Sequence, residues 1–112
     1  MKASALLVGV LLLAGPAGGA EPRPETVLGV GTDFDAGRVT FVVASGGCTT
    51  RADFRCKLED GTLTLVRERP DTCKAMPERY TVAFTLKELG LSPHQPFRLG
   101  NRLIVNENLA RP

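Results

Sequence analysis

The amino-acid sequence predicts an all-β protein, a single antiparallel β-sandwich of six to seven short strands. Two observations predict it. Apolar and polar residues alternate with a period of two in several short stretches, which is typical of strands with one buried face. Turn-forming pairs separate these stretches, and Asp60-Gly61 is the clearest of them. Two sheets that each have one apolar face bury those faces against each other, so a sandwich follows.

The alternation also places the individual strands. The four clearest strands cover residues 38–45, 52–59, 62–68 and 79–86, and shorter candidates cover residues 26–30, 97–99 and 102–105. In the stretch 52–59 the residues expected to point inward are Ala52, Phe54, Cys56 and Leu58, and those expected outward are Asp53, Arg55, Lys57 and Glu59. Further turns are predicted at residues 35–37 and 46–47, and a second tight hairpin at Gly100-Asn101.

One short helical turn is predicted near residues 86–90. Thr85 and Glu88 have the spacing of a capping box, in which each side chain binds a free amide of the first turn. Gly90 and then Pro93 follow closely and allow no more than one turn.

The first 20 residues predict a secretory signal peptide that is cleaved before Glu21. Lys2 precedes a nine-residue apolar stretch, and small residues follow it. Nine residues span about 14 Å as a helix, which is too short for the roughly 30 Å core of a bilayer. We therefore expect an exported protein, periplasmic or extracellular, with no transmembrane anchor after cleavage. The mature chain is divided into an extended lead-in (21–25), the sandwich domain (26–106) and a flexible tail (107–112).

Composition excludes several function classes. The net charge is +2, with 14 basic and 12 acidic side chains, so nucleic-acid binding is not expected. The chain has a single His and no motif of a hydrolase, a metalloprotease or a phosphate-binding loop, so we expect neither an enzyme nor a cofactor. A metal site built from Cys73, Met76 and His94 is disfavoured because Cys73 is expected in a disulfide. We expect a monomer.

The three cysteines allow three pairings, and strand register chooses among them. If Asp60-Gly61 forms the turn, Cys56 faces Leu65 in the middle of the hairpin. Cys48 precedes the outgoing strand and Cys73 follows the returning one, so both lie at the same end. We therefore predict a Cys48–Cys73 disulfide and a free, buried thiol at Cys56.

The function that fits best is a small exported, non-enzymatic binding module acting through a loop or an exposed strand edge. The candidate binding residues are Gly46, Gly47, Thr49, Thr50 and Arg51, because two glycines beside a cross-link form a rigid loop. Its partner would be a protein or an envelope component. Replacing Arg51 with Ala is expected to weaken partner capture without lowering thermal stability. Two alternatives are a structural or envelope-stability protein, and a redox or metal-handling protein that uses Cys56.

Overall fold

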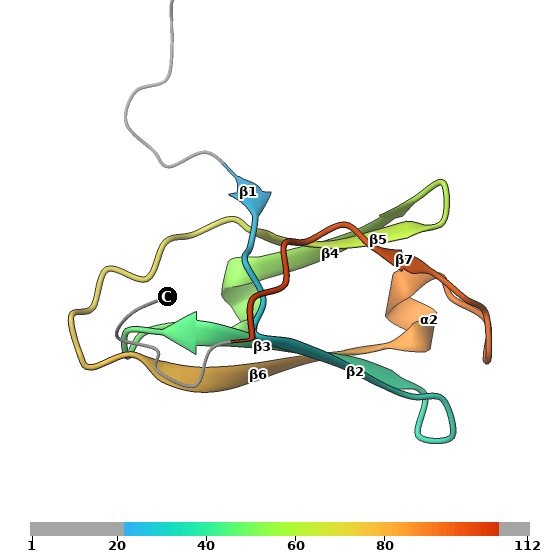
Figure 1. The fold of residues 1–112 in the computed structure, drawn as a ribbon, viewed down its shortest axis with the longest axis horizontal. Coiled ribbons are helices and arrows are strands. Elements are labelled where there is room, and N and C mark those ends of the chain that lie inside the picture. Colours follow the sequence, from blue (N-terminus) through green and yellow to red (C-terminus); the bar gives the residue numbers. More distant parts are fainter. Residues whose placement is uncertain (1–21, 106–112) are drawn as a thin grey trace, which may run out of the picture.

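The computed structural model describes residues 22–105, which form two β-sheets packed face to face with a short helix at one end (Figure 1). The predicted all-β sandwich is confirmed. The predicted signal peptide (1–20) and tail (107–112) lie outside the described residues.

The elements follow the order β1 (Arg23–Pro24), β2 (Gly29–Asp33), β3 (Arg38–Ser45), the 3-10 turn η2 (Arg51–Asp53), β4 (Phe54–Glu59), β5 (Thr62–Arg67), β6 (Glu78–Thr85), α2 (Leu86–Leu89) and β7 (Arg98–Leu99). One sheet has the antiparallel order β2-β3-β6. In the other, β4 pairs along one edge of β5, so β1 and β7 pair with opposite ends of its other edge.

The β4–β5 hairpin has the predicted register. Cys56 faces Leu65, and Glu59 faces Thr62 across the turn. Asp60 and Gly61 both have positive φ angles, 50° and 79°, as a type I′ turn requires. Because this register follows from the turn, the hairpin could be placed from sequence alone.

The C-terminal part of the domain differs from the prediction. β7 pairs with β5 in parallel, so the sheet is not wholly antiparallel. No hairpin forms at Gly100-Asn101. The chain continues past this point, and Leu103 makes only an isolated parallel bridge with Val27. The physical reason is that Asn101 is buried and its side chain binds the backbone of β5. Asn101 therefore pairs with this strand instead of forming a turn.

The N-terminal segment also differs from the prediction of an exposed lead-in. Arg23 and Pro24 pair with the end of β5 as β1. The chain then crosses from one sheet to the other, because the Glu25 amide binds Leu65 and the Leu28 amide binds Val42. Strand β2 therefore begins at Gly29, three residues after the predicted start of that strand, and continues to Asp33.

The strand predicted from residue 52 begins at Phe54, because residues 51–53 form η2. Asp53, expected to point outward, is buried, and Ala52, expected inward, is exposed. The Asp53 carboxylate accepts a hydrogen bond from the Thr50 amide (2.8 Å) and pairs with Arg69 (3.2 Å). The hydrogen bond between the Asp53 side chain and the Thr50 backbone therefore outweighs the apolar–polar alternation that predicted an outward Asp53.

The core lies between the sheets. Its fully buried side chains come from both layers, and the largest are Phe41, Leu63, Leu65, Val27, Val39, Val43 and Val82. Phe41 and Phe84 meet edge to face, with ring centroids 6.1 Å apart. Helix α2 closes one end with Leu86 and Leu89, and its predicted capping box between Thr85 and Glu88 is present. The opposite end carries the long loops.

Candidate functional site

Two loops meet at the end of the sandwich away from α2, at the left of Figure 1. Residues 46–50 follow β3, and residues 70–77 precede β6. Because Ser45 lies opposite Glu78 in the β3–β6 pair, the loops leave the sheet as neighbours. The predicted disulfide joins them, with the Cα atoms of Cys48 and Cys73 5.6 Å apart. We refer to residues 46–50 and 70–77 as the cross-linked loop pair.

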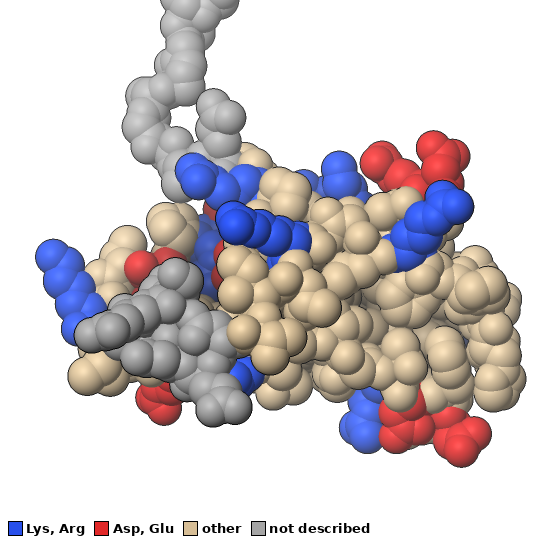
Figure 2. Space-filling view, in the orientation of Figure 1, with Lys and Arg blue, Asp and Glu red and all other residues tan. Residues whose placement is uncertain are grey.

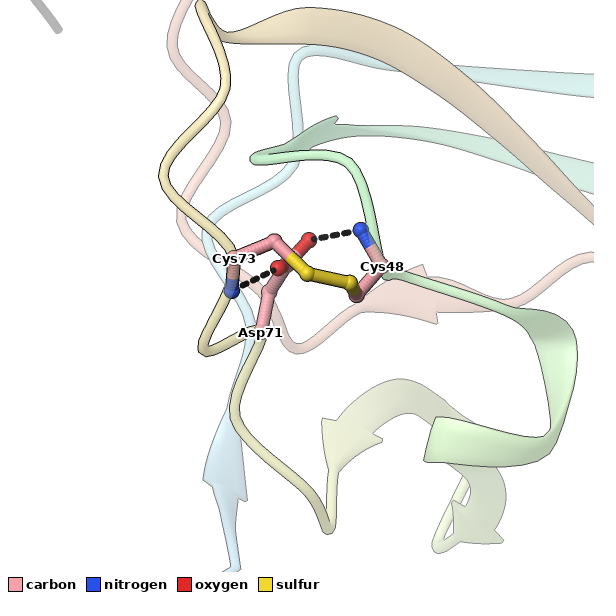
Figure 3. Close-up of side chains that lie close together, drawn as sticks. All are labelled: Cys48, Asp71 and Cys73. Carbon is pink, nitrogen blue, oxygen red and sulfur yellow. Dashed lines mark hydrogen bonds between the residues drawn. A yellow bond between two sulfur atoms is a disulfide. The ribbon is translucent and has the colours of Figure 1, made fainter.

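The carboxylate of Asp71 lies at the centre of this pair (Figure 3). Its Oδ1 accepts a hydrogen bond from the Cys73 amide at 3.0 Å. Its Oδ2 accepts from four donors: Ser45 Oγ (3.2 Å), Gly46 N (2.8 Å), Cys48 N (3.1 Å) and Thr49 Oγ1 (2.6 Å). Five donors from both loops and the end of β3 therefore converge on one side chain.

This arrangement favours the ionised carboxylate. The Thr49 hydroxyl lowers the pKa of Asp71 most, and the amides of Cys73, Gly46 and Cys48 lower it further, well below its ordinary range. Partial removal from water acts in the opposite direction but is outweighed. Asp71 is therefore negatively charged throughout the physiological pH range, and each donor gains a charged acceptor.

The two loops approach so closely that a side chain would not fit between them at Gly46. A Cβ atom built on Gly46 would lie 2.8 Å from the carbonyl oxygen of Cys73. The Gly46 carbonyl accepts a hydrogen bond from the Ala75 amide at 2.9 Å. Gly47 has a φ of 113°, which L side chains rarely adopt. The Gly-Gly pair therefore does more than reverse the chain, since it permits the loop-to-loop contact.

A second charged group supports the pair from inside the sandwich. Arg67 Nη1 donates to Thr49 Oγ1 at 3.3 Å, and Arg67 Nε (3.1 Å) and Nη2 (2.7 Å) both donate to the same oxygen of Glu25, Oε2. The Arg67 and Glu25 side chains are only 12% and 18% exposed. The Arg67 guanidinium also covers the ring of Phe54, 4.6 Å from its centroid. Through the hydrogen bonds of Arg67 to Glu25 and Thr49, and of Thr49 to Asp71, these four residues form one connected polar chain.

The predicted binding residues fall into two groups. Gly46, Gly47, Thr49 and Thr50 belong to the cross-linked loop pair, and of these Gly47 and Thr50 are exposed while Thr49 is buried. Arg51 lies outside it. A binding role for any of them stays a prediction.

Arg51 is exposed but already engaged. Its Nε donates to the Ala83 carbonyl at 2.9 Å, and its Nη2 pairs with Glu88. Its guanidinium lies 4.6 Å from the centroid of the Phe84 ring. Arg51 therefore ties η2 to the outer edge of β6 and to α2, instead of standing free for a partner.

Two residues matter here that sequence reasoning did not assign to this site: Asp71 was given no role, and Met76 was considered only as a metal ligand. Met76 is 76% exposed in the 70–77 loop, where its neighbours Ala75 and Pro77 are exposed as well. One signal could have drawn attention to Met76. It is a large apolar residue in a polar loop, outside any stretch whose apolar–polar alternation would predict that it is buried. Asp71 gave no such signal, because its role depends on donors from a segment over 20 residues away.

Cys56 lies on β4, half-buried against the core. Burial raises the pKa of its thiol to about 12, Arg51 lowers it slightly and Glu88 raises it. The thiol is therefore protonated at neutral pH and is a poor nucleophile and a poor metal ligand.

Within residues 22–105, the one group of three potential metal-ligating side chains is Cys48, Asp71 and Cys73. The two sulfur atoms are bonded to each other, so neither is available as a thiolate ligand. His94, considered with Cys73 and Met76 above, packs against Phe34, with ring centroids 5.4 Å apart.

The surface charge is mixed. On the face shown in Figure 2, acidic and basic side chains alternate around the rim, and uncharged residues cover much of the middle. Several of the basic side chains pair with acidic ones, among them Arg55 with Glu68 and Arg69 with Asp53. In the part of the chain that the structure describes, no helix is long and apolar enough to cross a membrane.

No protein-family model matches the chain, and neither the curated proteins nor the solved structures include a significant match to it.

Proposed function

We propose that the protein is a small exported, non-enzymatic binding module that contacts a protein or an envelope component through the cross-linked loop pair. One observation carries the proposal. Met76 stands 76% exposed in a loop whose preceding residues are fixed by the disulfide at Cys73 and by the five hydrogen bonds to Asp71.

Rigidity and exposure together favour binding. A loop that is already ordered loses little conformational entropy when a partner docks. A methionine side chain is flexible and polarisable, and it adapts to apolar partner surfaces. The exposed Gly47 and Thr50 lie in the neighbouring loop and offer backbone and hydroxyl groups beside this apolar contact. Export is supported by the predicted signal peptide and by the disulfide, which is typical of oxidising compartments.

The experiment is site-specific photo-crosslinking in the cells that produce the protein. A photoreactive residue replaces Met76, and a matched control carries it at Lys87, an exposed position on α2 at the other end of the sandwich. We expect a discrete crosslinked species from position 76 that is absent from position 87.

Three outcomes would contradict the proposal. Identical patterns at both positions would show that the loop pair is not a preferred contact. No crosslinked species at position 76 would remove the binding role. A crosslink from position 76 to a second copy of the chain would favour the alternative of a self-associating structural protein.

A further inference from the structure

We propose that the Asp71 carboxylate assembles the cross-linked loop pair before the disulfide forms, and thereby favours formation of the Cys48–Cys73 bond. Asp71 would act as a positioning residue for the oxidation of these two thiols. This inference does not depend on the proposed binding function.

The Asp71 carboxylate lies between the two cysteines. The amides of Cys48 and Cys73 both bind the same carboxylate, at 3.1 Å and 3.0 Å. One side chain therefore fixes the backbone at both cysteines, as Figure 3 shows. Neither hydrogen bond requires a bond between the sulfur atoms, so the same carboxylate holds the two thiols as neighbours in the reduced protein.

The Asp71 carboxylate is itself held in place by the folded sandwich. Gly46 N and the Thr49 hydroxyl bind its Oδ2 from the β3 side, and Thr49 in turn accepts a hydrogen bond from Arg67. Arg67 is anchored by its contact with Glu25 and by the ring of Phe54. The template is therefore part of the folded sandwich and does not rely on the cross-link.

The third thiol, Cys56, lies away from this pair. Cys56 lies in the middle of β4 opposite Leu65, half-buried against the core. Its protonated state at neutral pH makes it slow to attack a disulfide. In the folded protein, then, the two thiols that Asp71 holds together react with each other.

The chemistry balances with a disulfide oxidant such as oxidised glutathione. The thiolate of the exposed Cys48 attacks one glutathione sulfur, and the first glutathione leaves as its thiolate. The Cys73 thiolate then attacks Cys48 Sγ in this mixed disulfide and releases the second glutathione. Two protein thiols are oxidised, one oxidised glutathione gives two reduced ones, and the protons pass to the leaving thiolates. Holding Cys73 beside Cys48 accelerates the second, intramolecular attack.

The test measures the equilibrium between the reduced and oxidised loop pair in glutathione buffers. Cys56→Ala serves as the parent, so that only two thiols take part. Asp71→Asn retains the size of the side chain, but removes the charge and turns one acceptor into a donor. We expect the equilibrium constant for oxidation to fall about tenfold or more, because the two thiols are no longer held as neighbours in the reduced protein and their effective concentration falls.

Asp53→Asn is the matched control. Asp53 likewise accepts an amide hydrogen bond, from Thr50, but it contacts neither cysteine. We expect this variant to change the oxidation equilibrium less than about threefold. An Asp71→Asn protein whose equilibrium constant stays within that same range of the parent would overturn the proposal.

A second measurement decides the question if Asp71→Asn fails to fold. In the double variant Cys48→Ser/Cys73→Ser, which lacks the disulfide, Asp71 still meets all its donors. We expect the amides at positions 46 and 48 to stay protected from hydrogen exchange there. Exchange at the rate of an unstructured chain would show that the disulfide, and not Asp71, organises the loops, and the proposal would fail.

Discussion

The side-chain amide of Asn101 binds both backbone groups of Leu65, as a residue of a paired strand would. Its Oδ1 accepts from the Leu65 amide at 2.8 Å, and its Nδ2 donates to the Leu65 carbonyl at 2.8 Å. Nδ2 also donates to the Glu25 carbonyl at 2.7 Å. One side chain thus fills the gap on the outer edge of β5 between β1 and β7.

Removing this amide is expected to weaken the whole domain. Asn101→Ala leaves the buried amide of Leu65 without its partner and removes the hydrogen bonds to the Leu65 and Glu25 carbonyls. We therefore expect a loss of about 2–3 kcal/mol in the free energy of unfolding. Urea denaturation at neutral pH measures it. Gln95→Ala is the control, since its side chain accepts one hydrogen bond, from the Ser92 amide, in an exposed loop. Equal losses in the two variants would contradict the strand-like role of Asn101.

Arg51→Ala is expected to lower stability, in contrast to the prediction from sequence. The guanidinium bridges the Ala83 carbonyl, Glu88 and the Phe84 ring, and these exposed contacts together are worth about 1–2 kcal/mol. Thermal denaturation of Arg51→Ala beside Arg55→Ala provides the comparison, because Arg55 makes a single exposed pair with Glu68. A melting temperature for Arg51→Ala at or above that of Arg55→Ala would show that the bridge contributes no more than a single exposed pair.

Stability should decrease in acid through Asp71. The folded-state pKa of Asp71 lies below its value of about 4 in an unfolded chain. Its stabilising contribution is therefore fully present above about pH 4, and is lost as the pH falls towards the folded-state pKa. Glu88, whose pKa is also lowered, acts in the same direction because of the Thr85 amide and Arg51.

Urea midpoints at neutral pH and in acid measure this dependence. Asp71→Asn should be less stable than the wild type at neutral pH, and the difference should shrink as the pH falls below about 4. A difference that stays constant across this range would rule out a role for the ionised carboxylate.

The Cys56 thiol should be inert in the folded protein. A pKa of about 12 reduces the thiolate fraction near pH 8 about a thousandfold relative to an ordinary thiol. We expect an aromatic disulfide reagent to modify Cys56 rapidly only after the chain is unfolded in denaturant. The Cys48–Cys73 disulfide stays intact without reductant, so the assay reports a single site. Rapid labelling under native conditions would reopen the redox alternative.

Gly46→Ala should disturb the loop pair. A Cβ at this position would lie 2.8 Å from a backbone carbonyl oxygen, so the two loops must move apart, at a cost of about 1–3 kcal/mol. Gly29→Ala is the matched control, because there the added carbon would meet Val42 at an ordinary 3.6 Å. Circular dichroism during thermal melting compares them. Gly46→Ala with wild-type stability would show that the loops are not in tight contact.

The features that local rules govern could be predicted from the sequence. The Asp60-Gly61 turn set the β4–β5 register, and with it the place of Cys56 and the pairing of Cys48 with Cys73. The capping box between Thr85 and Glu88 set the single turn of α2. In each case, residues within a few positions of one another determine the geometry.

The features that depend on distant partners could not be predicted. Asn101 reads as a turn residue, and only the exposed edge of β5, over 30 residues away, turns it into a pairing residue. Asp71 reads as a loop residue until the amides that follow β3 are placed beside it. Arg51 reads as a free cation because its acceptor belongs to the outer edge of β6. Each assignment required a long-range contact that alternation and turn signals do not encode.

The isolated bridge between Val27 and Leu103 joins the two ends of the described chain, and Asn101 must arrive before the edge of β5 is complete. The sandwich therefore cannot close on a partially emerged chain. Contacts of such long sequence separation make folding slow and leave the growing polypeptide open until its last strand is present. A chain of this topology completes its core only once Leu103 can reach Val27, which would keep it threadable through a narrow channel if it is exported as we propose.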